Sequence, residues 1–132
     1  MALMFLNGEG MHGGQAHRHI AGAPLVGERR TAPRYGFLSF RDEFPGLLAV
    51  DAGGAAIAGE LYDVPMDQLR NLVMTEPPEL ELSIVELDGG ELSFGMVVRA
   101  GEQSSAGVVD ITEHGGWRAY RHAAAAEQPR TS

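Results

Sequence analysis

The chain has 132 residues, of which 44% are hydrophobic and 21% are charged, and this composition fits one globular domain. Its net charge of -8 argues against a nucleic-acid partner, because phosphate binding requires a positive field. Cys and Lys are absent, which excludes disulfides, thiol nucleophiles, thiolate metal sites and Schiff-base chemistry. Without Cys, a basic leader or a long apolar run, the sequence is that expected of a cytoplasmic protein with no membrane segment.

The first expected element is a short apolar strand, Leu3–Leu6, which runs into a glycine-rich loop. The loop begins with Asn7, Gly8, Glu9, Gly10 and Met11. Glycines let other groups approach the backbone closely, and consecutive unpaired N–H groups can hold an anion or a carboxylate. The spacing matches neither the dinucleotide-binding nor the nucleoside-triphosphate motif. The loop is therefore either a site for a small carboxylate or amide, or a plain turn without a ligand.

The middle of the chain predicts several strands and one helix. A short helical turn is expected over 15–20. Alternating apolar residues predict strands over four segments, 25–31, 35–40, 47–50 and 55–62. The segment 41–46 is expected to be a turn, closed by Pro45-Gly46. Apolar residues at helical spacing predict an amphipathic helix over 65–74, which Pro77-Pro78 prevents from continuing.

The last third predicts a hairpin and a C-terminal helix. Strands over 79–84 and 92–99 flank a turn at Asp88-Gly89-Gly90. A brief extended piece over 108–111 and a helix from Trp117 to Ala126 follow. One domain is expected over 1–126, with a disordered tail over 127–132. The fold class is α+β, with a small mixed sheet forming a closed or nearly closed β-barrel and short helices at its rim.

Carboxylates are the strongest candidates for chemistry. The five His residues are irregularly spaced, so neither a metal site nor another cofactor is predicted. The Ser residues lack a Gly-x-Ser-x-Gly context. Glu60 lies in the middle of a predicted strand, and Glu76 follows the predicted helix. Each is either a solvated surface residue or an acid lining a half-apolar cavity, where its pKa would be raised towards that of a general acid or base.

The chain resembles the gamma-glutamylcyclotransferase-like family, in which a small mixed barrel holds its substrate with the first loop. The most specific segment is Gly59-Glu60-Leu61-Tyr62-Asp63-Val64-Pro65, which follows Phe44-Pro45-Gly46 and precedes the short helix. The resemblance implies that Glu76 is the acid/base residue. The family loop usually reads Tyr-Gly-Ser/Thr, where this chain has Asn7-Gly8-Glu9, and Pro77 replaces a Gly after the acid.

A closer likeness is to the C-terminal domain of allophanate hydrolase and related amidases, over about residues 3–122. The matching segments are 32–35, 42–46, 76–78 and 115–120. In that family the domain lies behind an amidase-signature domain. It is proposed there to assist the breakdown of urea-derived compounds, including decarboxylation of N-carboxyurea-type intermediates, or to organise assembly.

Three functions follow from the resemblance. The first is a stand-alone enzyme of lyase or decarboxylase type that binds a small carboxylated amide or urea-derived compound. In that case Asn7 to Met11 form one wall of the only well-defined cavity, and Glu76 reaches into it. The second is a non-catalytic accessory or assembly module, with an amidase or a second copy of the chain as partner. The third is a gamma-glutamylcyclotransferase.

Overall fold

The computed structural model describes residues 2–127, which form eight strands, two α-helices and three short 3₁₀ helices. The strands are β1 Ala2–Leu6, β2 Leu25–Arg30, β3 Tyr35–Phe40, β4 Phe44–Ala49, β5 Ala58–Val64, β6 Leu80–Glu86, β7 Leu92–Val98 and β8 Val108–Asp110. The helices are η1 His17–Ile20, α1 Met66–Thr75, η2 Glu102–Ser104, η3 Thr112–His114 and α2 Trp117–Glu127. The tail predicted over 127–132 lies outside the described residues from position 128 onwards. Neither α-helix of the described chain has the length and apolar content needed to cross a lipid bilayer.

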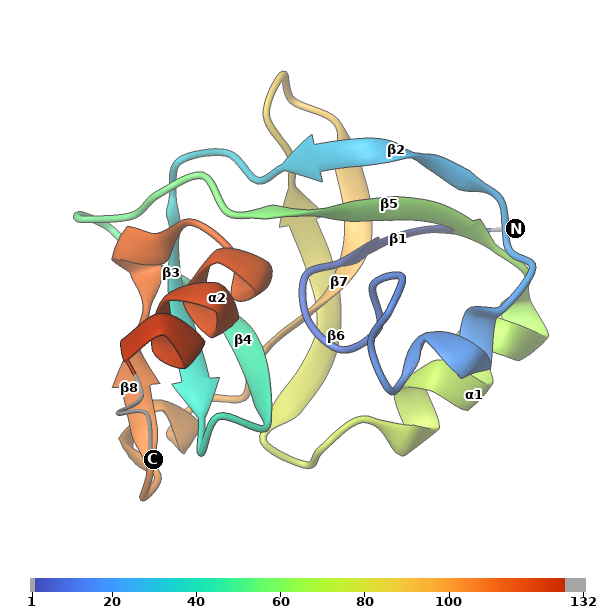
Figure 1. Ribbon diagram of the computed structural model, residues 1–132. Helices are drawn as coiled ribbons and strands as arrows, with labels where there is room; N and C mark the ends of the chain where they lie inside the picture. Colours follow the sequence, from blue (N-terminus) through green and yellow to red (C-terminus); the bar gives the residue numbers. More distant parts are fainter. Residues whose placement is uncertain (1, 128–132) are drawn as a thin grey trace.

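The strands form one mixed sheet in the order β2-β5-β1-β7-β4-β3-β8, and β6 pairs with β7 outside this path. In Figure 1 the group β2, β5 and β1 runs across the direction of β3 and β4. The α+β class and the mixed sheet are confirmed. Closure into a barrel is not supported, because no pairing of the described strands joins β2 to β8. The sheet bends around β7 instead of closing.

The bend arises because β1 and β4 share one edge of β7. Parallel β1 pairs with Phe94 and Gly95 in the middle of β7, and parallel β4 takes over at Val97. The other edge of β7 is paired along its length with antiparallel β6. The chain must therefore leave the sheet after Leu6, where β4 comes in. Such a point, at the carboxyl end of a strand whose neighbours diverge, leaves a crevice beside the loop that follows.

The connection between β3 and β4 differs from the prediction of a six-residue turn over 41–46. The turn is shorter, and Arg41 and Asp42 both adopt positive φ angles, 56° and 59°. Strand β4 starts at Phe44, so Pro45 and Gly46 lie inside it. Proline is tolerated there because β4 meets β7 only at Leu47, which leaves its other edge free beside Pro45.

The core packs between the sheet and the helices. Helix α1 spans Met66–Thr75, close to the predicted 65–74, and buries Leu69 and Leu72. In Figure 1 it lies beside η1, while α2 lies in front of β3 and β4. All six residues of β3 are buried, so this strand is covered on both faces and does not have the single buried face that alternation suggests. Trp117 at the start of α2 is 3% exposed and belongs to the same core.

Candidate functional site

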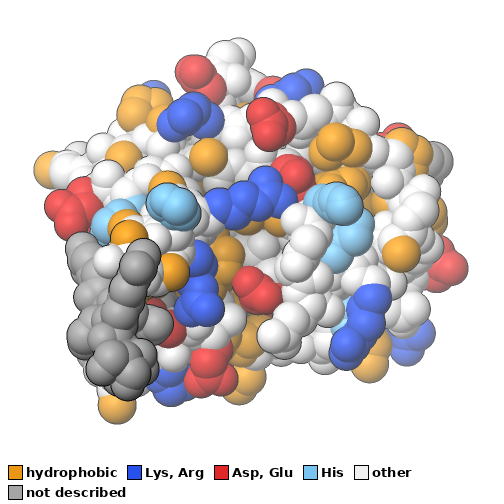
Figure 2. Space-filling model, in the orientation of Figure 1, with side chains coloured by type: hydrophobic (Ala, Val, Ile, Leu, Met, Phe, Trp, Pro, Cys, Tyr) orange, Lys and Arg blue, Asp and Glu red, His pale blue; other side chains and the backbone are white. Residues whose placement is uncertain are grey.

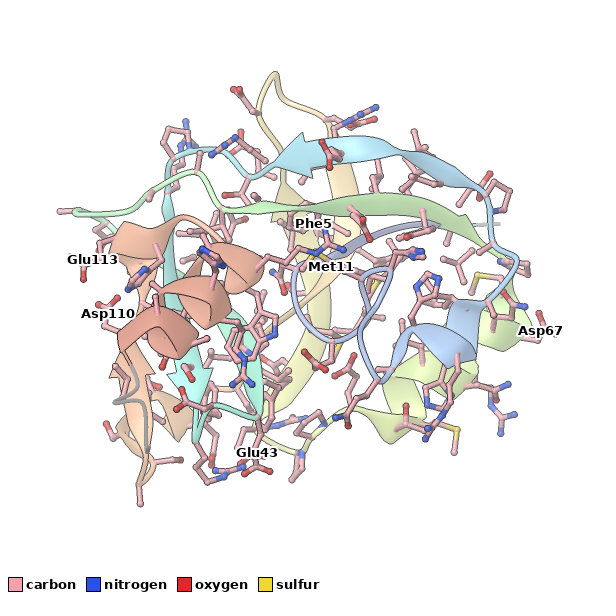
Figure 3. All side chains as sticks on the ribbon, viewed as in Figure 1. Phe5, Met11, Glu43, Asp67, Asp110 and Glu113 are labelled. Carbon is pink, nitrogen blue, oxygen red and sulfur yellow. The ribbon has the colours of Figure 1, made fainter. Side chains whose placement is uncertain are left out.

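The glycine-rich loop folds back on itself directly after β1. Met11 N–H donates to the Gly8 carbonyl at 3.1 Å, and Ala16 N–H donates to the Glu9 carbonyl at 3.0 Å. Gly8 lies against Pro45 of β4, and a Cβ at this position would be only 2.6 Å from Pro45 Cδ. This close approach requires glycine at position 8, because a side chain there would collide with Pro45. Figure 3 shows Met11 on this loop, near Phe5 of β1.

A small cavity of about 40 Å³ lies at the point where the loop leaves the sheet. Asn7, Gly8, Glu9 and Gly10 line it from one side, with Phe44, Pro45 and Glu76 among the other lining residues. A single water needs about 10–15 Å³ of such space, so the cavity has room for about three waters. The structure therefore brings Glu76 together with four of the five predicted loop residues.

Glu76 follows α1, with its backbone extended at φ -68° and ψ 150°. Burial raises the pKa of its carboxyl group to about 7. No charged or hydrogen-bonding neighbour offsets this effect among the described residues. A carboxyl group with a pKa near neutrality can both give and take a proton under ordinary conditions.

Asn7 lines the same cavity and carries a buried side-chain donor that is not used. Its side chain is 8% exposed, and its Nδ2 atom has no hydrogen-bond partner within the described part of the chain. An unpaired buried amide costs free energy, so such groups are rare unless something else satisfies them. Across residues 2–127, the N–H groups of Gly8, Glu9 and Gly10 likewise have no acceptor. Unpaired N–H groups of this kind are donors that suit a carboxylate or a developing oxyanion.

Glu9 lines the cavity, but its carboxylate is already occupied. Its Oε2 accepts from Trp117 Nε1 at 2.8 Å, and its Oε1 accepts from the N–H of Gln15 at 3.2 Å. Two donors thus hold the charge of Glu9 in place beside the cavity. Trp117 belongs to the segment 115–120 that carries the family likeness, but the sequence predicted no role for it in the site.

Glu60 anchors the loop from the opposite side. Its Oε1 accepts from His12 N–H at 2.8 Å and from the Tyr62 hydroxyl at 2.9 Å, and its Oε2 pairs with Arg118 at 3.3 Å. Burial alone would raise the pKa of Glu60, but these three partners outweigh the effect of burial, so the pKa is lowered. Burial and the bond to Glu60 raise the pKa of Tyr62 to about 12. Glu60 is therefore a fixed carboxylate with a structural role.

Met11 lies apart from the Glu76 cavity. It lines a larger groove of about 610 Å³ between β2, β5 and the start of α2, together with Arg29, Arg30 and Trp117. The expectation of a single well-defined cavity is therefore wrong, because the side of the loop beyond Gly10 faces this second space. On the face shown in Figure 2, Arg and acidic side chains are interspersed. Within residues 2–127, no three side chains of His, Asp or Glu gather as metal ligands would.

The sequence and the geometry together identify the family. The family model of the allophanate hydrolase C-terminal domain matches residues 2–122. The chain belongs to this family. The urea amidolyase of Saccharomyces cerevisiae is 36% identical over 77 residues, which cover 58% of this chain and 4% of that protein. The urea amidolyase of Lachancea kluyveri is 32% identical over the same length. The chain thus spans only a small part of the curated relatives that it matches.

Solved structures agree with this assignment. A uropathogenic E. coli-specific protein is 29% identical with a TM-score of 0.85, over 92% of this chain and 95% of that chain. Kluyveromyces lactis allophanate hydrolase is 25% identical with a TM-score of 0.86, over 93% of this chain and 21% of that chain. An aig2-like protein from Mus musculus has a TM-score of 0.63 at 21% identity, covering 81% of this chain and 82% of that chain, which shows the fold alone. The predicted gamma-glutamylcyclotransferase-like fold is thereby confirmed.

Proposed function

We propose that the chain is a small acid/base enzyme that binds a carboxylated amide or urea-derived compound between the glycine-rich loop and Glu76. The observation that carries the proposal is the shared cavity of Glu76 and Asn7. In it a carboxyl group with a pKa of about 7 lies with a buried amide donor that has no partner among the described residues. Relatives named as allophanate hydrolase and urea amidolyase support a ligand of the urea-carboxylate class.

The proposed reaction is removal of the carboxylate from the ligand nitrogen. Asn7 Nδ2 and the loop N–H groups stabilise negative charge, which moves onto the amide oxygen as the bond between nitrogen and the carboxylate carbon breaks. The electron pair of that bond stays with the nitrogen. Protonated Glu76 donates its proton to that nitrogen, carbon dioxide leaves, and Glu76 is reprotonated from water. One proton is consumed for each molecule of carbon dioxide released.

The test is turnover of urea carboxylate labelled with ¹³C at the carboxylate, followed by NMR. Glu76→Gln keeps the size of the side chain but cannot donate the proton, so we expect a loss of roughly 10²-fold or more in rate. The matched control is Glu113→Gln, at the outer edge of the molecule (Figure 3), where the Glu113 side chain is 86% exposed. The wild-type rate should fall as the pH rises above about 7, because Glu76 loses its proton.

Two outcomes would contradict the enzymatic proposal. One is a wild-type protein that does not accelerate the reaction at any pH between about 5 and 8, on either side of the Glu76 pKa. The other is a Glu76→Gln variant as fast as the control. To distinguish this activity from that of a gamma-glutamylcyclotransferase, turnover of a gamma-glutamyl amide is measured with the same variants.

A non-catalytic accessory module for an amidase is the second candidate. Strand β6 pairs only with β7 among the described strands, and apolar side chains of this hairpin are exposed, with Ile84 at 55% and Leu92 at 59%. An uncovered apolar strand edge is typical of an interaction surface. Light scattering of the chain with and without a purified amidase from this family tests this role, and Ile84→Asp should abolish any complex. A homodimer would be seen in the same experiment.

A further inference from the structure

The C-terminal helix α2 is bonded to one wall of the Glu76 cavity and to the turn that leads into the other wall. One wall is the loop segment Asn7–Gly10, and the other is Phe44–Pro45, which follows the turn between β3 and β4. The walls meet where Gly8 lies against Pro45. One turn of α2 donates hydrogen bonds to the loop, and the next turn donates to Asp42, which precedes the second wall in the chain.

The first turn of α2 holds the loop. Trp117 Nε1 donates to Glu9 Oε2 at 2.8 Å, and Arg118 donates to the His12 carbonyl oxygen at 2.7 Å. Arg118 also reaches Glu60, the acid that accepts from the N–H of His12. The loop is therefore fixed to α2 at Glu9 and at His12.

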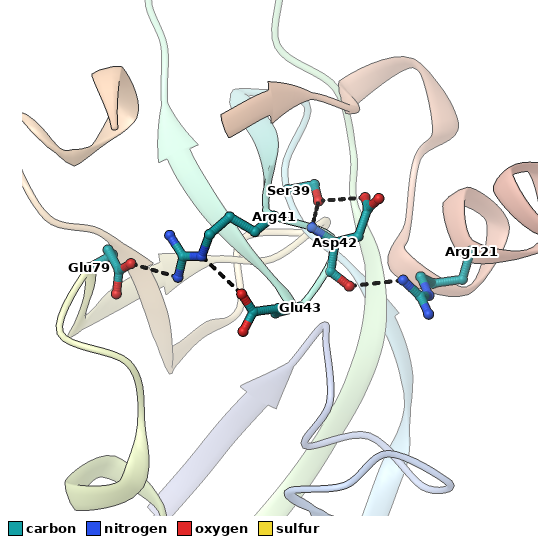
Figure 4. A network of polar contacts seen from close by, with 6 residues as sticks. All are labelled: Ser39, Arg41, Asp42, Glu43, Glu79 and Arg121. Atoms are coloured by element: carbon teal, nitrogen blue, oxygen red, sulfur yellow. Dashed lines mark hydrogen bonds and ion pairs between the residues drawn. The ribbon is translucent and has the colours of Figure 1, made fainter. Parts of the chain in front are cut away.

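The next turn of α2 holds the β3–β4 connection. The Tyr120 hydroxyl donates to the Asp42 carboxylate, and Arg121 donates to the Asp42 carbonyl oxygen at 2.8 Å. Figure 4 shows Arg121 reaching Asp42, whose side chain also accepts from Ser39. The guanidinium of Arg121 lies over the Trp117 ring, 5.5 Å from its centre, so the contacts to the two walls are themselves coupled.

We infer that Trp117 and Tyr120 are positioning residues, which hold the two walls of the Glu76 cavity together and thereby set its shape for a small carboxylated amide. The inference rests on the proposed function in taking this cavity as the site. The exposure of α2 supports it. Trp117 is buried, but residues 118–126 are half-buried or exposed, so the few hydrogen bonds described above are a large part of what holds the helix.

The test compares Trp117→Phe and Tyr120→Phe with Tyr35→Phe. The control loses a buried hydroxyl that accepts from the N–H of Glu86 at 3.0 Å, a bond between β3 and β6 in which α2 takes no part. The probe is oxamate, which carries a carboxylate beside a primary amide, and its Kd is measured by NMR titration. We expect binding to weaken about tenfold in the two α2 variants, because loosened walls no longer present their donors in one geometry. Tyr35→Phe should bind as the wild type does.

Two further measurements do not depend on a ligand. The first is the ¹³C titration of the Glu76 carboxyl group, whose pKa should fall from about 7 towards 4.5 in both α2 variants as water enters the cavity. The second is amide hydrogen exchange. Trp117→Phe should accelerate hydrogen exchange at the Met11 and Ala16 amides of the loop. Tyr120→Phe should accelerate exchange at the Glu43 amide of the turn. Each of these amides is hydrogen-bonded in the wild type.

The outcomes separate the two proposals. If the wild type does not bind oxamate but the variants shift the Glu76 titration, the proposed function fails and the role of α2 stands. If the Glu76 titration stays unchanged, or if hydrogen exchange accelerates at all amides together, Trp117 and Tyr120 are ordinary structural residues and the inference is overturned. Should Trp117→Phe fail to fold, Tyr120→Phe decides by the same measurements.

Discussion

Asn7 and Ser39 are both buried polar residues, but only one of them has its hydrogen bonds satisfied. Ser39 is fully buried and its hydroxyl donates to Asp42 at 3.2 Å, whereas Asn7 Nδ2 has no partner in the described chain. A polar group that stays unpaired in a buried position stabilises nothing by itself. An unpaired Asn7 is what the proposed ligand binding requires, because its amide is then free to bond the ligand.

The contrast between Asn7 and Ser39 predicts that substitutions at the two positions affect the free energy of unfolding differently. Asn7→Leu keeps the branching and the number of heavy atoms of the side chain and removes an unsatisfied amide, so the free energy of unfolding should stay within about 1 kcal/mol of the wild type or increase. Ser39→Ala removes a satisfied buried bond and should cost about 1–2 kcal/mol. Urea denaturation followed by circular dichroism measures both. A loss of more than about 2 kcal/mol in Asn7→Leu would show that Asn7 is a structural residue.

Glu76 predicts a pH dependence of stability. Its pKa is about 7 in the folded chain and 4.5 when unperturbed, so folding favours the protonated form. The contribution of protonated Glu76 to the free energy of unfolding is fully present below pH 4.5 and is lost as the pH rises through about 7. The loss reaches about 3 kcal/mol at most.

The measurement is the difference in unfolding free energy between the wild type and Glu76→Gln at pH 5 and pH 8. The two proteins should be similar at the lower pH, and the variant should be the more stable at the higher pH. Because other titrating groups are common to both proteins, they cancel in this difference. A difference that does not change with pH would mean that water reaches Glu76 in the folded protein.

At the scale of elements, most of the fold could be predicted from patterns of apolar residues. The strands β1 and β3, helix α1 and the β6–β7 hairpin follow directly from period and from turn residues. The β3–β4 connection could not be predicted in this way. Pro45-Gly46 is usually a turn signal, but here Arg41 and Asp42 take the positive φ angles instead, held by contacts to distant elements.

Those distant contacts make Asp42 the critical residue of the turn. Asp42→Ala leaves the buried hydroxyl of Ser39 without its acceptor and places Ala at a φ of 59°. We expect a cost of about 1–3 kcal/mol in unfolding free energy. The adjacent control is Glu43→Ala, whose side chain is 63% exposed and pairs with Arg41 at the surface, where the cost should be below about 1 kcal/mol. Equal costs for the two variants would show that Asp42 has no special part in the turn.

At the scale of the whole molecule, the site depends on the order of the strands, which periodicity does not reveal. Glu76 and Asn7 are distant in sequence, and they meet because β1 and β4 share an edge of β7 and open a crevice there. The family resemblance pointed to both residues before the structure did. The contacts of Trp117 and Arg118 with the loop could not be inferred from the sequence, because no local pattern specifies which loop a helix will meet.

The last prediction uses Trp117, the one Trp of the chain, as a reporter of α2. Its ring is buried against the loop, while most of the helix beyond it is exposed, so α2 should separate from the domain at a lower free energy than the sheet unfolds. In urea, the red shift of Trp emission should therefore have a lower midpoint than the circular dichroism signal of the strands. Saturating oxamate should bring the two midpoints closer if ligand binding requires both walls to be held. Coincident transitions in the free protein would show that α2 and the sheet unfold as one cooperative unit, because different probes then report the same event.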